Sequence, residues 1–140
     1  MKLQSITANM MVKDVTKSVE YYTQILGFDL FMWVDFDKQA DFDRIHEDVE
    51  YAFAILKSEN YELMLQSEKS LSTDLPFLEK WYSNSSLALY LRIENIEEYF
   101  DSIKDRVEIL KNIETTWYGM KEFYVKDING YILGFAEIWE

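Results

Sequence analysis

The chain contains no cysteine, one proline, four glycines and one histidine among its 140 residues. Without cysteine it forms no disulfide, carries no thiolate nucleophile and builds no zinc–thiolate site. The scarcity of glycine and proline indicates a backbone mostly in regular elements, because few loops need unusual dihedral angles. The chain also lacks a glycine-rich phosphate loop and a nucleophile elbow.

Long hydrophobic runs are absent as well. No apolar stretch approaches membrane-spanning length, and the N-terminal sequence MKLQSITANMMVKD has no apolar core of signal-peptide length. We therefore expect a cytoplasmic protein with no membrane partner.

Basic side chains are outnumbered, with 14 Lys and Arg against 26 Asp and Glu and a net charge of −12. This charge repels phosphate backbones, so we expect no nucleic-acid partner. The acidity serves solubility or attracts a cationic ligand, and composition alone leaves both explanations open.

Hydrophobic and aromatic residues are plentiful. They include four Trp, ten Tyr and nine Phe, and nearly half of the chain is hydrophobic. This composition suffices for the core of a single domain over 1–140, and aromatic residues beyond the needs of a core can line a pocket.

One pattern of a strand followed by a helix occurs twice. In residues 8–28 an alternating strand gives way at Asp14, a predicted N-cap, to a helical stripe that stops at Gly27. Residues 87–110 repeat the pattern with Asn95 as the predicted cap, 81 positions after Asp14.

The segments after the two helices also match. Each contains a strand (29–36 and 107–113) and then a hairpin, and an offset of 70 places Phe53 on Phe123 and Leu63 on Leu133. We therefore predict two βαβββ modules, the first over about 4–66 and the second over about 85–138.

Two other segments lie outside this repeat. The connector 67–84 holds the only proline, Pro76, and a cluster of small polar residues. The charged insertion 37–50 fits either a short helix or a solvated loop.

The two modules resemble the vicinal oxygen chelate superfamily, which includes glyoxalase I, bleomycin-resistance proteins, fosfomycin-resistance enzymes and extradiol dioxygenases. The opening motif of that superfamily is matched by Asp14, Val15, Ser18, Tyr21, Tyr22, Leu26, Gly27 and Phe28. The closing motif is matched by Gly119, Phe123, Asp127, Asn129 and Gly130, with Ile128 in place of the usual proline. The resemblance implies an α+β fold in which a mixed sheet forms an open cup, with the helices outside.

The resemblance also implies where metal ligands would lie. Three of the four ligand positions fall on Thr7, Ala88 and Gly134, none of which is a good ligand for a divalent metal. The fourth falls on Glu62 by the motif and on Met64 by the internal repeat, so Glu62 is the only plausible ligand. We therefore expect no metal site and no cofactor, although a divalent metal held by non-standard ligands stays an alternative.

Strand alternation indicates which side chains face the cup, because the face packed on the helices must be apolar. The polar sides of the first, fourth, fifth and last long strands give ligand-binding candidates. These are Thr7, Asn9, Glu62, Met64, Tyr90, Arg92 and Gly134. Glu62 is also a candidate general base, or else a carboxylate paired with Arg92 or with water. Arg92 is either an ion-pair partner or an anchor for an anionic ligand group.

Tryptophans and tyrosines outside the helical stripes complete the candidate site. Trp33 lies on a strand with large apolar residues on both faces, and Trp117 and Tyr118 precede Gly119 in a loop. Trp81 and Tyr82 lie in the connector. Each of these aromatics fits a core or dimer contact as well as stacking on a ligand. His46, in the charged insertion, has no partner at ligand spacing.

Two functions remain. The first is a metal-free, non-catalytic homodimer, similar to bleomycin-resistance proteins of antibiotic resistance, that sequesters a cationic or planar small molecule in an acidic, aromatic-lined cup. The alternative is a glyoxalase-like lyase or isomerase, or a related metal-dependent enzyme. Gly134 bears on both, because its missing side chain marks a β-bulge or leaves room for a ligand.

Overall fold

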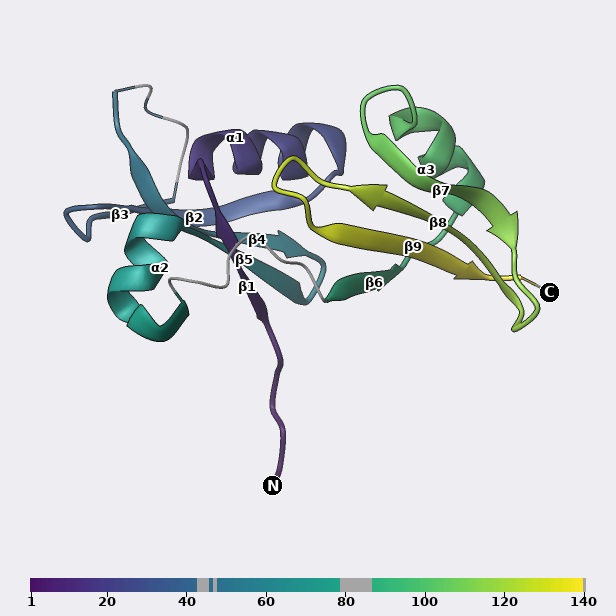
Figure 1. Cartoon of the computed structure of the whole chain (residues 1–140), viewed down its shortest axis with the longest axis horizontal. Coiled ribbons are helices and arrows are strands. Elements are labelled where there is room, and N and C mark those ends of the chain that lie inside the picture. Colours follow the sequence, from purple (N-terminus) through teal and green to yellow (C-terminus); the bar gives the residue numbers. More distant parts are fainter. Residues whose placement is uncertain (43–45, 47, 79–86, 140) are drawn as a thin grey trace. The chain divides into compact units, whose positions relative to one another are not determined.

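The computed structural model describes residues 1–42, 46, 48–78 and 87–139 (Figure 1). The chain forms two compact units, Met1–Tyr82 and Ser83–Glu140, and each is described by itself. Trp81 and Tyr82 of the connector lie outside the described residues.

Unit 1 contains a five-stranded sheet with the order β1-β5-β4-β2-β3, in which β1 runs parallel to β5 and the other neighbours are antiparallel. Its strands are β1 (Ala8–Val12), β2 (Asp29–Asp35), β3 (Ala40–Asp41), β4 (Tyr51–Ser58) and β5 (Tyr61–Ser67). Its helices are α1 (Val15–Glu20), which continues into a π-helical turn η1 (Tyr21–Ile25), α2 (Glu68–Asp74) and the short 3₁₀ helix η2 (Pro76–Leu78).

Unit 2 contains a four-stranded sheet with the order β6-β9-β8-β7, again with one parallel pair, β6 with β9. Its elements are β6 (Ala88–Arg92), α3 (Ile96–Ile103), β7 (Glu108–Thr115), β8 (Met120–Lys126) and β9 (Ile132–Ile138). The two mixed sheets with their helices confirm the predicted α+β fold of two βαβββ modules.

The two parallel strand pairs have the same register. In unit 1 Asn9 lies opposite Met64, and in unit 2 Tyr90 lies opposite Gly134. These positions are related by the offsets of 81 and 70 found in the sequence, so the structure places Met64, and not Glu62, at the repeat-equivalent of Gly134.

The offset of 70 is wrong for β8 by one residue. In unit 1 the hairpin closes at Ser58 and Tyr61, whereas in unit 2 it closes at Lys126 and Ile132 around a longer turn. The Asp127 carboxylate shapes that turn, because its Oδ1 accepts hydrogen bonds from the backbone N–H groups of residues 129 and 131. As a result Glu122 and Tyr124, rather than Phe123 and Val125, occupy the positions equivalent to Phe53 and Ile55.

Both helix starts occur at the predicted residues, with different chemistry. The Asp14 carboxylate caps α1 by accepting a hydrogen bond from the Lys17 N–H at 2.9 Å. Asn95, in a left-handed conformation with φ of 56°, does not cap α3 with its side chain. The Glu137 carboxylate from β9 takes that role, accepting from the N–H groups of Asn95 at 2.7 Å and Ile96 at 3.3 Å.

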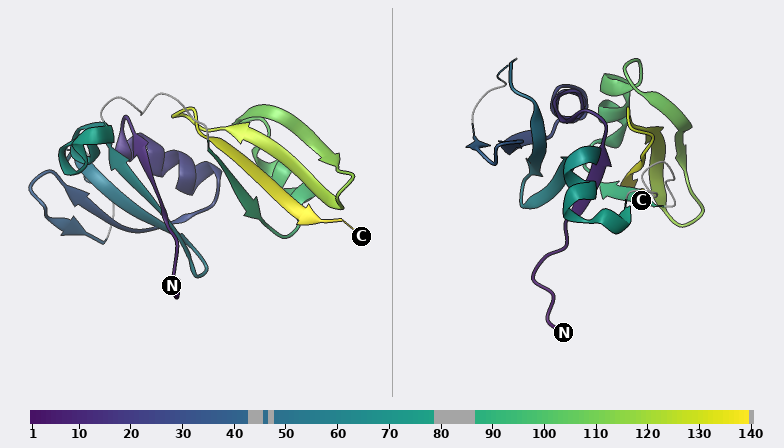
Figure 2. Two further views of the ribbon diagram at one scale, coloured as in Figure 1. Left: turned by 60° about the horizontal axis from the view of Figure 1, so that its bottom comes forward. Right: turned by 60° about the vertical axis from the view of Figure 1, so that its left-hand side comes forward.

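The core of unit 1 lies between α1 and one face of its sheet. Val15, Val19 and Tyr22 of the helical segment are buried, and the Tyr22 hydroxyl contacts the Met10 sulfur at 4.0 Å. The second helix, α2, lies on the opposite face, because it contacts Gln66, whose side chain points away from that of the core residue Leu65. Figure 2 shows α1 and α2 on different sides of the strands of this unit.

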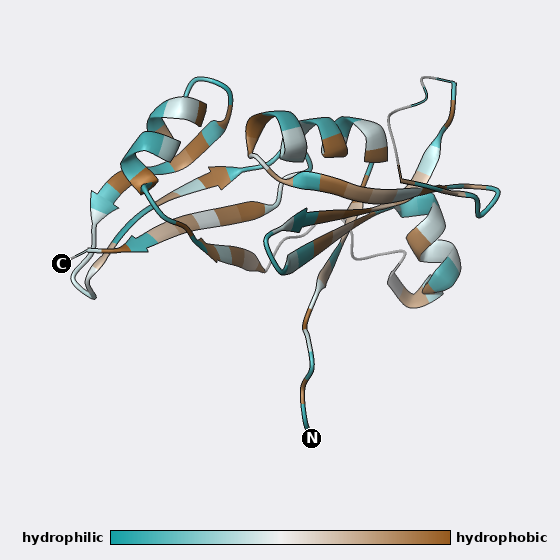
Figure 3. Cartoon of the chain, turned by 180° about the vertical axis from the view of Figure 1, so that it is seen from behind, coloured by the Kyte–Doolittle hydropathy of each residue, from teal (hydrophilic) through white to brown (hydrophobic). Residues whose placement is uncertain are grey.

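The core of unit 2 is aromatic. Phe123 and Phe135 stack across β8 and β9 with ring centroids 5.1 Å apart, and Phe100 of α3 packs edge-on against Phe123. Figure 3 shows hydrophobic stretches along the strands and mixed hydropathy on the helices, as expected for helices with one face in the core.

The two segments outside the repeat contain more structure than the sequence indicates. The connector, for which the sequence indicated no helix, includes α2 and η2, while its residues 79–84 lie outside the described residues. The insertion 37–50 begins with a turn and the short strand β3, and residues 43–45 and 47 lie outside the description. None of the helices in the described ranges is long and apolar enough to cross a membrane.

Candidate functional site

The face of the unit 2 sheet opposite α3 carries a buried carboxylate that is hydrogen-bonded by tyrosines. Since α3 packs on Phe123 and Phe135, strand alternation turns the neighbouring side chains to the other face. These are Tyr90, Arg92, Glu122, Tyr124, Gly134 and Ala136, which lie in adjacent cross-strand positions.

Glu122 lies at the centre of this face with 1% of its surface exposed. The Tyr90 hydroxyl donates a hydrogen bond to its Oε2 atom at 2.5 Å, and the Tyr118 hydroxyl donates to its Oε1 atom. Tyr118 reaches the carboxylate from the β7–β8 turn, where Gly119 adopts a φ of +83° and Thr116 bonds to Met120. Both carboxylate oxygens are therefore held by phenols.

Three phenols around Glu122 have raised pKa values. Burial raises the pKa of Tyr90 most, and the hydrogen bond to Glu122 and its negative charge raise it further. For Tyr118 the hydrogen bond to Glu122 is the largest cause of the raised pKa, and for Tyr124 it is burial. All three stay neutral near pH 7 and act as donors or as aromatic surfaces.

No basic side chain among the described residues forms an ion pair with Glu122. Lys111 on β7 pairs instead with Glu114 at 2.8 Å, and that hydrogen bond is the main cause of its raised pKa. A buried carboxylate is costly unless it is paired or hydrogen-bonded, and here two phenols supply the hydrogen bonds without neutralising the charge. The face therefore presents aromatic rings over a fixed negative charge.

Gly134 has a structural explanation that corrects both sequence hypotheses. The β8–β9 register runs without interruption from residue 120 to residue 126, so Gly134 does not mark a bulge. A Cβ atom there would lie 2.6 Å from Cε2 of Tyr124. The space left by the missing side chain is thus filled by the Tyr124 ring, and it is not room for a ligand.

The corresponding face of unit 1 brings together Asn9, Met64 and Gln66. The Asn9 amide donates to the Gln66 side-chain oxygen at 2.9 Å, and Met64 lies opposite Asn9. Thr7 precedes β1 and is half-buried. Within unit 1 Glu62 is paired with Lys57 on the neighbouring strand at 3.9 Å.

Trp33 does not lie on this face. It is opposite Ala54, in the cross-strand row that continues through Leu65 to Met10, and this row faces α1. Its ring is fully buried and stacks on Tyr51 with centroids 4.1 Å apart. Trp33 is therefore a core residue, and its predicted role in stacking on a ligand is corrected.

The two remaining candidates lie in unit 2 and are accessible. Trp117 is 94% exposed in the β7–β8 turn and packs edge-on against Tyr118, which binds Glu122. Arg92 is exposed on β6, two residue pairs along from Tyr90 and Gly134. Their roles in ligand binding stay predictions.

The positions that the superfamily uses for a metal do not fit one in this chain. Ala88 and Gly134 have no donor atom, Thr7 offers only a hydroxyl, and Glu62 is engaged by Lys57. Across the described ranges no three His, Cys, Asp or Glu side chains converge in a way that could hold a metal ion. His46, outside these positions, pairs with Asp41 at 3.0 Å.

Glu122 and Tyr124 are the residues that sequence reasoning missed. Alternation in the segment KEFYVK would have found them, because Phe123 and Val125 must face the core and Glu122 and Tyr124 then face the other way. The repeat offset obscured this by matching Phe53 with Phe123.

Comparison with known proteins agrees with this fold. The chain belongs to the Glyoxalase/Bleomycin resistance protein/Dioxygenase superfamily, whose family model matches residues 3–135. No curated protein sequence matches the chain.

Several solved structures share the fold at low sequence identity. A protein of unknown function from Agrobacterium tumefaciens has a TM-score of 0.73 at 16% identity, covering 98% of this chain and 95% of its own. TioX from Micromonospora sp. ML1 has a TM-score of 0.67 at 14% identity, covering 97% and 99%. A glyoxalase-related enzyme from Fulvimarina pelagi has a TM-score of 0.68 at 17% identity, covering 96% and 88%.

Proposed function

We propose that this protein is a metal-free, non-catalytic binding protein of the cytoplasm that sequesters a cationic, planar small molecule, in the manner of bleomycin-resistance proteins. The observation that carries the proposal is the buried Glu122 carboxylate held by Tyr90 and Tyr118. The ligand would lie over the phenol rings of the unit 2 face, with its positive charge toward Glu122.

Two physical effects favour a cation at this face. Aromatic rings attract cations through their quadrupole, by about 0.5–1 kcal/mol at exposed sites and about 2 kcal/mol when desolvated. A phenol that donates to a carboxylate carries more electron density in its ring, and the carboxylate adds its own field. Tyr90 and Tyr118 are each close to half exposed, so their rings are accessible while the charge beneath them is shielded from water.

The same features argue against a proton-transfer role. The raised pKa values of Tyr90 and Tyr118 make both phenols poor general bases near pH 7. The Glu122 oxygens are both occupied by donors from the protein, which leaves neither directed at a substrate proton.

The test is a calorimetric titration with 1-methylquinolinium, a planar cation, and with quinoline at pH 8 as its neutral counterpart. We expect the cation to bind more tightly, and we expect Glu122→Gln to weaken its binding about tenfold or more, equivalent to about 1.4 kcal/mol. The matched control is Glu108→Gln, which removes the same charge from an exposed position on β7 and should leave affinity unchanged.

Equal binding of the two compounds, or equal weakening by the two variants, would contradict the proposal. Tyr118→Phe provides an independent variant, since it removes one hydrogen bond to Glu122 and keeps both the carboxylate and the ring. We expect it to alter cation affinity by less than Glu122→Gln does.

Metal independence is part of the proposal and is tested separately. Elemental analysis of the purified protein should find no stoichiometric transition metal, and chelator treatment should leave its melting temperature unchanged. A bound metal with a large stabilisation would favour the alternative, a glyoxalase-like lyase or isomerase with non-standard ligands.

We also propose a homodimer, supported by large exposed apolar side chains in unit 2 such as Leu87, Ile138 and Trp139. Light scattering at high protein concentration should give a mass near twice the 16.8 kDa of one chain. A monomeric mass would count against the dimer and would leave the Glu122 site, which lies within one chain, unaffected.

A further inference from the structure

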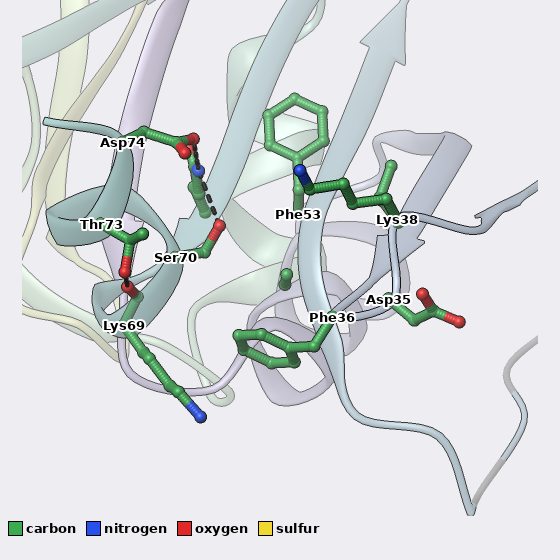
Figure 4. A pocket seen from close by; sticks show the side chains of 11 residues that line it. Asp35, Phe36, Lys38, Phe53, Lys69, Ser70, Thr73 and Asp74 are labelled. Carbon is green, nitrogen blue, oxygen red and sulfur yellow. Dashed lines mark hydrogen bonds between the residues drawn. The ribbon is translucent and has the colours of Figure 1, made fainter.

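A second candidate binding site lies in unit 1, under α2. A cavity of about 400 Å³ lies between α2 and the sheet face opposite α1, and its size falls in the range of small-molecule sites. Figure 4 shows side chains of α2 on one side of it and Phe36, Phe53 and Lys38 on the other. None of its lining residues belongs to the Glu122 face.

The wall formed by α2 is fixed by hydrogen bonds to a buried amide. Gln66 on β5 is 6% exposed, and its Nε2 atom donates to the Ser70 hydroxyl at 2.8 Å and to the Asp74 carboxylate at 2.9 Å. Asn9 donates to the amide oxygen of Gln66 from the other side at 2.9 Å. Because these bonds tie α2 to the sheet, the cavity is a feature of the folded unit rather than a gap beside a loose helix.

The floor of the cavity is apolar and aromatic. Val34, Ala52 and Phe53 contribute from the sheet, and Phe36 contributes from the end of β2. The register shift between Val34 and Asp35 contributes to this floor, because it brings Ala52 and Phe53 to the cavity together. Two phenylalanine rings offer a flat aromatic group a surface for stacking.

The acidic side chains that line the cavity are engaged by hydrogen bonds within the protein, whereas the two lysines are not paired with described carboxylates. Asp35 accepts hydrogen bonds from the backbone N–H groups of residues 37 and 39, and Asp74 accepts from Gln66. Lys38 and Lys69, in contrast, form no ion pair with any described residue. The Lys69 ammonium lies 5.1 Å from the centre of the Phe36 ring, and Lys38 is held in the β2–β3 turn with a φ of 63°.

We infer that this cavity binds a small aromatic carboxylate, with its ring against Phe36 and Phe53 and its carboxylate toward Lys38 and Lys69. Two ammonium groups that form no ion pair with a described carboxylate stand at one cavity in a chain whose net charge is −12. An anionic group would neutralise them, and the aromatic floor would bury the ligand's body. The ligand preference is thus opposite in charge to that of the Glu122 face.

The probe is 2-naphthoate, titrated into ¹⁵N-labelled protein and followed by ¹H–¹⁵N correlation spectra. We expect saturable shifts for the amides of residues 34–38, 52–53 and 66–74, and much smaller shifts with the neutral analogue 2-naphthamide. The double variant Lys38→Gln/Lys69→Gln should weaken naphthoate binding about tenfold or more.

The matched control is Lys17→Gln/Lys104→Gln, which removes two positive charges from exposed positions that do not line the cavity. It should bind naphthoate as the wild type does. Shifts confined to other residues, equal shifts with 2-naphthamide, or equal weakening by the two double variants would each overturn the inference. Because the Glu122 variants do not touch this cavity, the outcome is separate from that of the proposed function.

Discussion

Gly134 shows how a single glycine can be required by a neighbouring side chain rather than by its own backbone. Its Cα lies under the Tyr124 ring, so a methyl group added there would overlap the ring. We predict that Gly134→Ala lowers the free energy of unfolding by about 1–3 kcal/mol, the usual cost of overpacking. Urea denaturation measures this change.

The cause can be isolated with a second substitution. In a Tyr124→Ala background the ring is gone, so Gly134→Ala should cost far less than it does in the wild type. An equal cost in both backgrounds would show that strain at Gly134 arises from something other than Tyr124.

Tyr90 makes the free energy of unfolding vary with pH in the alkaline range. Its pKa in the folded state lies above the ordinary tyrosine value of about 10, because burial and Glu122 disfavour the phenolate. A raised pKa contributes stability that is complete below about pH 10 and is lost as pH rises through the folded value. We predict that stability falls above pH 10, and that it falls less steeply in Tyr90→Phe.

Urea denaturation at several pH values from 8 to 12 compares the two proteins. Ultraviolet absorbance of phenolate gives an independent check, since the wild type should contain one more late-ionising tyrosine than Tyr90→Phe. Identical stability profiles for the two proteins would refute this account of Tyr90.

At the scale of elements, α3 depends on a residue that is distant in sequence. Glu137 on β9 accepts hydrogen bonds from the first N–H groups of the helix, while Asn95 provides the turn but no side-chain cap. We predict that Glu137→Ala lowers the free energy of unfolding by about 1 kcal/mol, as loss of an N-cap does. Chemical denaturation measures the change, and Glu94→Ala, an exposed acidic control beside the helix, should be close to neutral.

The sequence predicted the locations of helices and strands better than it predicted the contacts between distant segments. Helical stripes located α1 and α3, and alternation located most strands, because both signals are carried by neighbouring residues. The Glu137 cap, the helix α2 in the connector and the one-residue shift of β8 all depend on contacts between distant segments. Glu122 was missed for a different reason, because the repeat offset of 70 placed Phe123 where the structure has Glu122.

Trp33 illustrates the same limit within a single strand. Large apolar residues on both faces of β2 leave core packing and ligand stacking equally open for Trp33. The structure places Trp33 in the core under α1, and a register shift between Val34 and Asp35 accompanies its stacking on Tyr51. Bulges reset strand alternation, and sequence periodicity does not reveal them.

At the scale of the whole molecule, the chain carries the fold of its superfamily with other chemistry at the metal-ligand positions. Those positions carry no adequate donors, whereas unit 2 carries a buried carboxylate beneath tyrosines. Unit 1 has a cavity with two ammonium groups that form no ion pair with a described residue. Membership in the superfamily does not decide among its activities, so function rests on these residues.

The most direct test of the central claim, that the Glu122 face binds a cation, is a ¹H–¹⁵N correlation spectrum recorded during titration with 1-methylquinolinium. We predict saturable shifts at residues 90–92, 117–124 and 134–136, and loss of those shifts in Glu122→Gln. Shifts located elsewhere, or a spectrum that does not change at millimolar cation, would contradict the account.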